Sequence, residues 1–207
     1  MLGYYNVSVI LTYLGLTGAV CGIGLAMDGR VGAAVALLML AGVCDMFDGK
    51  IARAIRRSDD AKTFGIQIDS LCDLVCFGVL PAVIAHRLGV TGRIGYAVLA
   101  LFVLAAVIRL GYFNVIEQKR QQHSDGEKER FHGLPVTTAS WLLPLYLLAS
   151  RLIAGKIFLP GLTGFMLLIA VLFVLDLNIK NPRWPGARYV AAAILLAAAV
   201  FAFTRFR

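Results

Sequence analysis

The sequence predicts an all-α membrane protein, a polytopic bundle of transmembrane helices. Hydrophobic residues make up 59% of the 207 residues and charged residues only 15%, whereas about 25% of an average soluble domain is charged. The mean hydropathy is +0.80. The apolar residues are grouped in runs of roughly 20, the length at which a helix crosses a bilayer core. A soluble globule of this size could not bury so much apolar surface, which excludes a disulfide-rich secreted fold, a disordered chain and a conventional nucleic-acid-binding domain.

Seven apolar segments are candidate spans, separated by breaks rich in glycine, proline and charge. They are residues 6–27, 33–57, 64–87, 94–117, 133–154, 158–177 and 189–204. The first lacks a basic leader and a cleavage site, so we expect it to remain as a span. The last is short and alanine-rich. We expect one integral-membrane domain over residues 1–207, with a six-helix core at about 6–178 and an extra C-terminal segment at about 179–207.

The basic residues predict how the chain lies in the membrane. Lys and Arg number 20 against 12 Asp and Glu, a net charge of +8. In a membrane protein such an excess marks cytoplasmic loops that face anionic lipid headgroups, rather than a nucleic-acid partner. A cytoplasmic N-terminus places most of these cations on the inner side. We therefore expect a protein of the cell (inner) membrane, with an outer C-terminus if the seventh segment crosses the bilayer.

Four carboxylates lie well inside the second and third segments. Asp45 and Asp48 are three residues apart, and Asp69 and Asp73 are four apart, so each pair projects from one face of its helix. With a rise of about 1.5 Å per residue, both pairs lie roughly 10–20 Å from the cytoplasmic end. The short turn between the segments would bring all four acids to a similar depth.

Ionised carboxylates at this depth are costly unless they bind cations or line a wet cavity. Pairing with arginines is one explanation, but only Arg53 and Arg109 lie at a suitable depth, which leaves four acids poorly neutralised. The alternative is a site for hard divalent cations, Mg²⁺ or Mn²⁺, resembling two-metal phosphoryl-transfer sites. Small residues beside the acids, Gly49, Ala52 and Gly65, leave room for a ligand, and the Arg53 guanidinium could clamp a phosphate.

The same residues resemble the signature of the CDP-alcohol phosphotransferase family, D-x-x-D-G-x-x-A-R followed by G-x-x-x-D-x-x-x-D. The matching stretches are Asp45-Met-Phe-Asp48-Gly49-Lys-Ile-Ala52-Arg53 and Gly65-Ile-Gln-Ile-Asp69-Ser-Leu-Cys-Asp73. The connection between them is longer than in the usual signature, and the extra residues fall in the polar stretch from Arg56 to Lys62. We expect a turn there to absorb them without disturbing either helix.

Three further stretches resemble one branch of that family, the integral-membrane CDP-diacylglycerol-serine O-phosphatidyltransferases. They are residues 69–82, Arg109-Leu-Gly-Tyr-Phe-Asn114 and Phe131-His-Gly-Leu-Pro135. Tyr112 replaces an arginine of the branch. The resemblance implies transfer of a phosphatidyl group from CDP-diacylglycerol to L-serine, with release of CMP, by a homodimeric enzyme among membrane lipids whose site opens to the cytoplasm.

The resemblance also implies roles for individual residues. Asp45, Asp48, Asp69 and Asp73 would hold the metal, with two ions expected, and Asp73 would also be the general base. The CDP pocket would comprise Asp48, Gly49, Ala52, Arg53 and Gly65. For the acceptor, Arg109 could meet the serine carboxylate, with Asn114 near its polar groups. Equally, Arg109 could extend towards the interface or pair with an acid. The Gly133-Leu-Pro135 stretch is expected to begin a helix, with proline in its first turn.

Three other functions fit parts of the pattern. The acceptor could be glycerol 3-phosphate or an inositol phosphate, although no second basic phosphate pocket is evident. Intramembrane prenyltransferases also use two Asp-rich motifs, but in longer chains and farther apart. A divalent-cation transporter could use intramembrane carboxylates, but it would not need glycines, an alanine and an arginine at these offsets.

Overall fold

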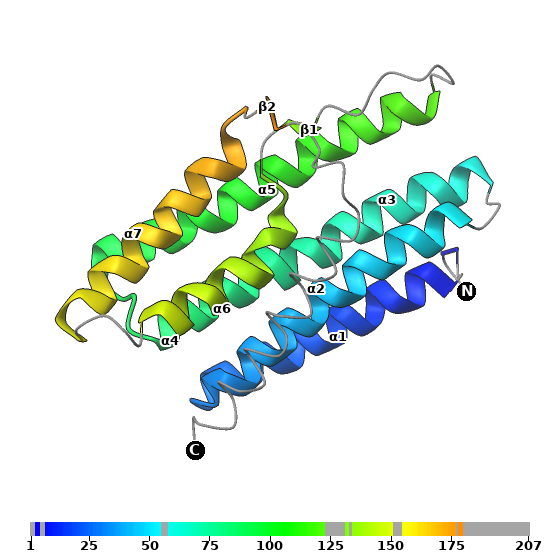
Figure 1. The fold of residues 1–207 in the computed structure, drawn as a ribbon. Helices are drawn as coiled ribbons and strands as arrows, with labels where there is room; N and C mark the ends of the chain where they lie inside the picture. Colours follow the sequence, from blue (N-terminus) through cyan, green and yellow to red (C-terminus); the bar gives the residue numbers. More distant parts are fainter. Residues whose placement is uncertain are drawn as a thin grey trace.

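The computed structural model describes residues 3–4, 7–54, 58–122, 131–132, 134–150, 155–176 and 178–179. The predicted all-α bundle is confirmed (Figure 1). Its α-helices are α1 (Val7–Met27), α2 (Val31–Ala54), α3 (Asp59–Asp73), α4 (Leu80–Arg87), α5 (Gly92–Gln122), α6 (Ala139–Ala149) and α7 (Gly155–Val174). Two further helical segments are the π-helix η1 (Leu74–Val79) and the 3-10 turn η2 (Val136–Thr138). The two short strands are β1 (Phe131–His132) and β2 (Asn178–Ile179).

Five helical stretches of the described chain are long and apolar enough to cross a bilayer. They are Val9–Met27, Val31–Gly49, Asp59–Arg87, Gly92–Lys119 and Ile157–Val174. The protein is therefore an integral membrane protein. In the described part of the predicted span at 133–154, the apolar helix is shorter and covers Val136–Ala149. The predicted seventh segment, residues 189–204, lies outside the described residues.

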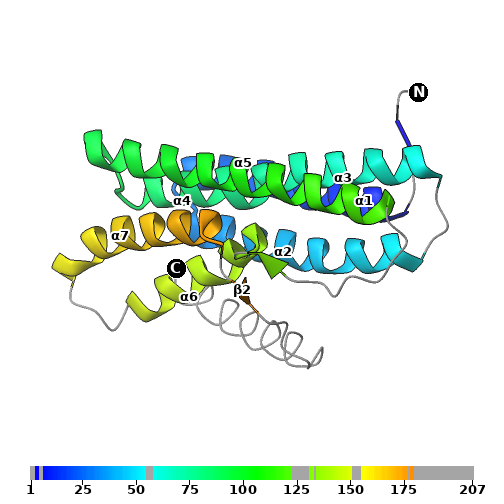
Figure 2. The same cartoon turned by 90° about the horizontal axis from the view of Figure 1, so that it is seen from above.

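The bundle has two groups of helices joined by a long central rod. α1 packs along α2, and α5 packs along α7, while α3, η1 and α4 form one continuous helix that contacts both groups (Figures 1 and 2). The N-terminus, the end of α2, the start of α3 and the end of α5 lie at the same end of the bundle. The charged stretches at these positions thus belong to one side of the membrane.

The start of α3 differs from the sequence prediction. The helix begins at Asp59 rather than at residue 64, so the expected polar turn from Arg56 to Lys62 is wrong in its second half. The Ser58 side chain accepts a hydrogen bond from the Ala61 N–H at 3.3 Å, and the acidic first turn suits the positive end of the helix dipole. Lys62 pairs with Asp59 at 2.8 Å. The residues that make the connection between the two motif stretches longer than usual therefore extend α3 at its start.

The middle of the central rod is a π-helix, Leu74–Val79, directly after Asp73. Such wide turns are rare and occur often near functional sites. Within it Gly78 is buried, and a Cβ atom added there would lie 3.4 Å from the Ala106 Cβ of α5. The wide turn thus lies where the rod meets α5 most closely.

Phe131 and His132 form a strand and Pro135 is extended, so the helix begins just after the Gly133-Leu-Pro135 stretch that was predicted to start it. β1 pairs antiparallel with β2, Phe131 opposite Ile179 and His132 opposite Asn178. The Leu134 N–H donates to the Leu172 carbonyl at 3.4 Å. Pro135 has extended dihedral angles and immediately precedes η2. Because proline restricts the residue before it to extended conformations, the helix cannot include Leu134, and it begins directly after the extended Pro135.

Small buried residues allow the helices to pack closely. Ala19, Ala34, Ala85 and Ala106 have no exposed surface, as expected where membrane helices associate through small side chains. Large apolar side chains on the outside, such as Leu101 and Leu104, remain exposed in the isolated chain. In the bilayer they face lipid.

Candidate active site

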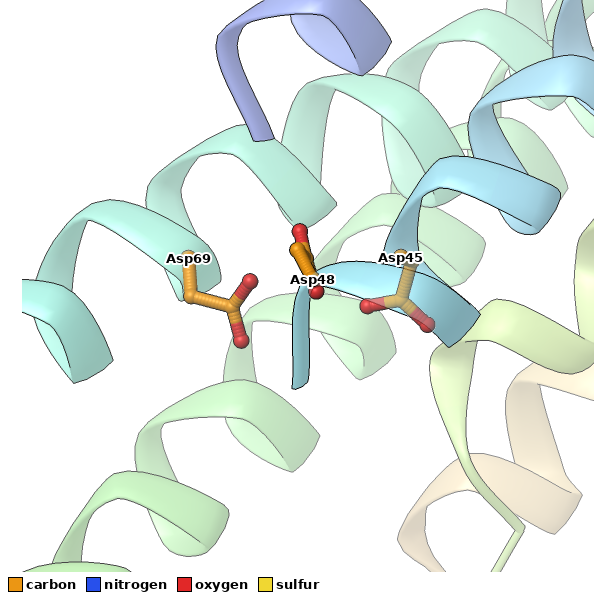
Figure 3. Close-up of side chains that lie close together, drawn as sticks. All are labelled: Asp45, Asp48 and Asp69. Carbon is orange, nitrogen blue, oxygen red and sulfur yellow. The ribbon is translucent and has the colours of Figure 1, made fainter. Parts of the chain in front are cut away.

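Three of the four intramembrane carboxylates form one cluster. Asp45, Asp48 and Asp69 each offer an oxygen, and these oxygens all lie within 4.8 Å of one another. In Figure 3 the Asp48 side chain lies between the other two, with Asp69 reaching towards it from α3. Oxygen atoms at this spacing can bind a single cation together.

The helix register explains the cluster. Asp45 lies nine residues before the end of α2 and Asp69 ten residues after the start of α3, which is about 14–15 Å along each helix. Since the two helices are consecutive and α1 contacts both, the acids meet at the same depth. The sequence prediction of a shared depth is thus correct for these three residues.

The chemistry of this cluster suits a hard divalent cation. Asp48 is only 5% exposed, and Asp45 and Asp69 are half-buried. Within the described part of the chain, no Lys or Arg side chain forms an ion pair with any of the three. The Arg53 side chain lies outside that part. Three carboxylates in a partly dry site, with oxygen as the only ligand atom, match the preference of Mg²⁺ and Mn²⁺.

Asp73 is buried close enough to interact electrostatically with all three acids of the cluster. It is the last residue of α3, one turn beyond Asp69 and therefore deeper in the membrane. Its side chain is 9% exposed, and it does not belong to the group of three with oxygens within 4.8 Å. Asp73 thus lies one turn beyond Asp69 and outside the 4.8 Å group, but within electrostatic reach of it.

The residues predicted for a CDP pocket lie beside the cluster along α2 and α3. A Cβ atom added at Gly49 would have no neighbour within 4 Å, so there is open space next to Asp48. Gly65 is half-buried, one turn before Asp69. Ala52 and Arg53 belong to the last turn of α2, and their side chains lie outside the described part.

Arg109 occupies a position that the sequence did not predict. It is 8% exposed, and its Nε donates to the Leu134 carbonyl at 3.2 Å. The ion pair with an acid, one of the two alternatives from the sequence, does not occur among the described residues. Arg109 therefore anchors the extended stretch before η2 against α5.

Asn114 bonds to α3. Its Oδ1 accepts from the Ser70 hydroxyl at 2.5 Å, and its Nδ2 donates to the Gln67 Oε1 at 3.4 Å. Ser70 and Gln67 flank Asp69 in the sequence. The amide therefore ties the part of α3 around Asp69 to α5.

Sequence reasoning missed Thr12, Gln67 and Ser70. Thr12 of α1 donates through Oγ1 to the Asp48 Oδ2 at 2.7 Å. The only signal available was a polar side chain inside an apolar run, which alone does not identify its partner.

A model of the CDP-alcohol phosphatidyltransferase family matches residues 5–175. The chain is also similar to a CDP-diacylglycerol-serine O-phosphatidyltransferase of Helicobacter pylori, with 35% identity over 164 residues, which cover 74% of this chain and 64% of that relative. It thus spans less than two thirds of that relative's length.

Two other relatives come from distant organisms. An archaetidylserine synthase of Methanothermobacter thermautotrophicus is 32% identical over 178 residues, covering 86% of this chain and 70% of the relative. A CDP-diacylglycerol-serine O-phosphatidyltransferase of Saccharomyces cerevisiae is 41% identical over 102 residues, covering 48% of this chain and 36% of the relative.

Proposed function

Because the chain belongs to the CDP-alcohol phosphatidyltransferase family, we propose that it transfers the phosphatidyl group of CDP-diacylglycerol to the hydroxyl of L-serine, giving phosphatidylserine and CMP. The observation that carries this proposal is the cluster of Asp45, Asp48 and Asp69 at the family motif positions. The names of the relatives support serine as the acceptor.

The three clustered carboxylates would hold one or two divalent ions, Mg²⁺ or Mn²⁺, with Asp73 as a further ligand. Bound there, the metal would neutralise the negative charge of the pyrophosphate during transfer. The protein contributes ligands that helices α2 and α3 hold in place before substrate arrives. Because positioning and charge neutralisation dominate phosphoryl transfer, little further machinery is required.

The donor would bind with its head beside α2 and α3 and its acyl chains in the bilayer. Open space at Gly49 lets the nucleotide approach the helix backbone, and Ala52 and Gly65 keep side chains small at the neighbouring turns. Asp48 would contact the donor together with the metal. Arg53 would place its guanidinium on the pyrophosphate.

The acceptor serine would approach the phosphatidyl phosphorus from the side on which Asp73 lies. The serine oxygen forms a bond to the phosphatidyl phosphorus while the bond from that phosphorus to the CMP oxygen breaks. The serine proton passes to the Asp73 carboxylate, and CMP leaves with the electron pair. Arg109, whose described bond uses Nε alone, has other N–H groups for the serine carboxylate, and Asn114 lies one turn farther along α5.

The site would face the cytoplasm of a cell whose inner membrane holds the protein. The charge distribution supports this orientation, because the end of the bundle with the N-terminus and the start of α3 carries many of the cations. Cysteine placed at Ser58 should react with an impermeant thiol reagent only from the cytoplasmic side. Cysteine at Thr91, in the connection at the other end of the rod, should react only from outside. The reverse pattern would overturn the orientation.

The resemblance further supports a homodimer. The mass of the purified protein in lipid nanodiscs measures this directly. A mass for two chains is expected, and a mass for one chain would remove the homodimer from the proposal.

The reaction is tested with purified full-length protein, CDP-diacylglycerol and Mn²⁺ or Mg²⁺, by following CMP release. Serine, glycerol 3-phosphate and inositol phosphate are supplied separately. We expect release with serine, loss of release for Asp69→Asn, and normal release for the matched control Asp59→Asn, whose side chain is 96% exposed. Release only with another acceptor would refute serine specificity. No release with any acceptor, together with Mn²⁺ flux in liposomes, would identify a transporter instead.

A further inference from the structure

The contact between α1 and α2 follows a regular antiparallel register. A Cβ atom added at Gly15 would lie 3.5 Å from the Cys44 Cβ, and one at Gly22 would lie 3.5 Å from the Leu37 Cβ. The two residue numbers add to the same value in both contacts, as they must when two helices run side by side in opposite directions. Glycine at these positions permits the close approach.

This register brings Thr12 opposite Asp48. Thr12 lies one turn before Gly15 on α1, and Asp48 lies one turn after Cys44 on α2. The Thr12 Oγ1 donates to the Asp48 Oδ2 at 2.7 Å, a length typical of a hydroxyl bonded to a carboxylate. Thr12 is half-buried and Asp48 is 5% exposed, so the bond is shielded from bulk water.

We propose that Thr12 is a positioning residue for the metal cluster, holding the Asp48 carboxylate in the orientation in which it can share a cation with Asp45 and Asp69. This inference rests on the proposed function, since it requires that the cluster binds metal. With one oxygen held by the hydroxyl, rotation of the Asp48 side chain is restricted. Outer groups that orient ligands in this way commonly contribute about 10–100-fold to metal affinity.

The arrangement also connects α1 to the cluster. The family motif lies on α2 and α3, whereas α1 contributes no residue to it. Through Thr12, however, α1 reaches Asp48, whose side chain lies between those of Asp45 and Asp69 in Figure 3. A shift of α1 relative to α2 would therefore change the geometry of the cluster, even though α1 supplies no ligand.

Two substitutions separate the hydrogen bond from packing. Thr12→Val keeps the shape of the side chain and removes the donor, whereas Thr12→Ser keeps the donor and removes a methyl group. Thr17→Val is the matched control on α1, because the exposed Thr17 hydroxyl donates to the Tyr13 carbonyl of its own helix at 2.8 Å. Binding of Mn²⁺ to the purified full-length protein is measured by electron paramagnetic resonance of the free ion, without substrate.

We expect Thr12→Val to weaken Mn²⁺ binding about 10–100-fold, Thr12→Ser to bind close to the wild-type affinity, and Thr17→Val to be unchanged. Equal weakening by Val and Ser would show that packing matters and would overturn the proposal, as would wild-type affinity in Thr12→Val. If the wild-type protein itself binds no Mn²⁺, the metal site of the proposed function fails and this inference fails with it. Wild-type binding with an unaffected Thr12→Val rejects this inference alone.

Discussion

The α1–α3 region and the α5–α7 region both place charged side chains inside the membrane, but the surroundings of these side chains differ. In the first, acids on two consecutive helices meet within 4.8 Å and form a cluster that suits a cation. In the second, the buried cation Arg109 bonds to a backbone carbonyl 25 residues away. The acids of the first region remain available to bind a ligand. In the second region, Arg109 instead holds an extended segment in place.

The difference shows what kinds of contact a sequence pattern can predict. The acids lie on adjacent helices with helical spacing, so their meeting follows from the pitch of the helix and a short connection. The partner of Arg109 is the Leu134 carbonyl, a group that every residue possesses. Its identity depends on how α5, α7 and the 131–135 segment pack, which no motif encodes.

The largest effect should come from neutralising the cluster in the first region. For Asp45→Asn, Asp48→Asn or Asp69→Asn we expect CMP release to fall at least about 10⁴-fold, because an amide cannot replace the charge that binds the metal. Excess EDTA should abolish wild-type activity in the same assay, and added Mn²⁺ should restore it. Full activity in EDTA would contradict the metal assignment.

Asp73→Asn tests whether the deeper acid differs in function from the cluster. We expect kcat to fall about 10²–10⁴-fold while CDP-diacylglycerol binding is retained, because the amide keeps the shape but cannot accept the serine proton. Turnover is measured across a Mn²⁺ titration. Recovery of the wild-type rate at high Mn²⁺ would show that Asp73 is only a ligand.

Arg109→Met tests whether the Arg109 guanidinium holds the segment around Leu134 against α5 in the second region. Without the guanidinium the carbonyl of half-buried Leu134 loses this partner, and the loss of a partner by a shielded polar group typically costs up to about 1–3 kcal/mol. We expect lower stability and faster hydrogen exchange in a peptide that covers residues 131–136. The exposed Arg93→Met is the control. A raised KM for serine with unchanged exchange would instead favour Arg109 as the acceptor site alone.

The smallest effect concerns the bond that joins the two regions. Ser70→Ala and Asn114→Ala each remove the 2.5 Å hydrogen bond between α3 and α5. Because bonds between membrane helices average about 0.6 kcal/mol in double-mutant cycles, we expect a coupling free energy of that size. It is measured by unfolding the single and double variants in detergent mixtures. Strictly additive effects would show that the bond does not tie the regions together.

Much of the helical architecture was predictable because hydropathy and length set the spans. The meeting of Asp45, Asp48 and Asp69 was predictable from helical spacing and a short connection, whereas the metal-binding role of Asp73 stays a prediction. The start of α3 was missed because the Ser58 cap and the acidic first turn extend the helix into a polar stretch. The strand at Phe131–His132 and the extended Pro135 were missed because the groups that hold this stretch are distant in sequence and lie on β2, α7 and α5. Thr12 was missed because its role exists only through the register of α1 on α2.

The central claim is that carboxylates from two helices form one cation site. Equilibrium Mn²⁺ binding to the wild type, Asp45→Asn, Asp69→Asn and the double variant tests it most directly. If the acids share an ion, each single change should weaken binding strongly, and the double change should cost much less than the sum of the two free-energy losses. Wild-type affinity in Asp69→Asn, or fully additive losses in the double variant, would contradict a site shared between α2 and α3.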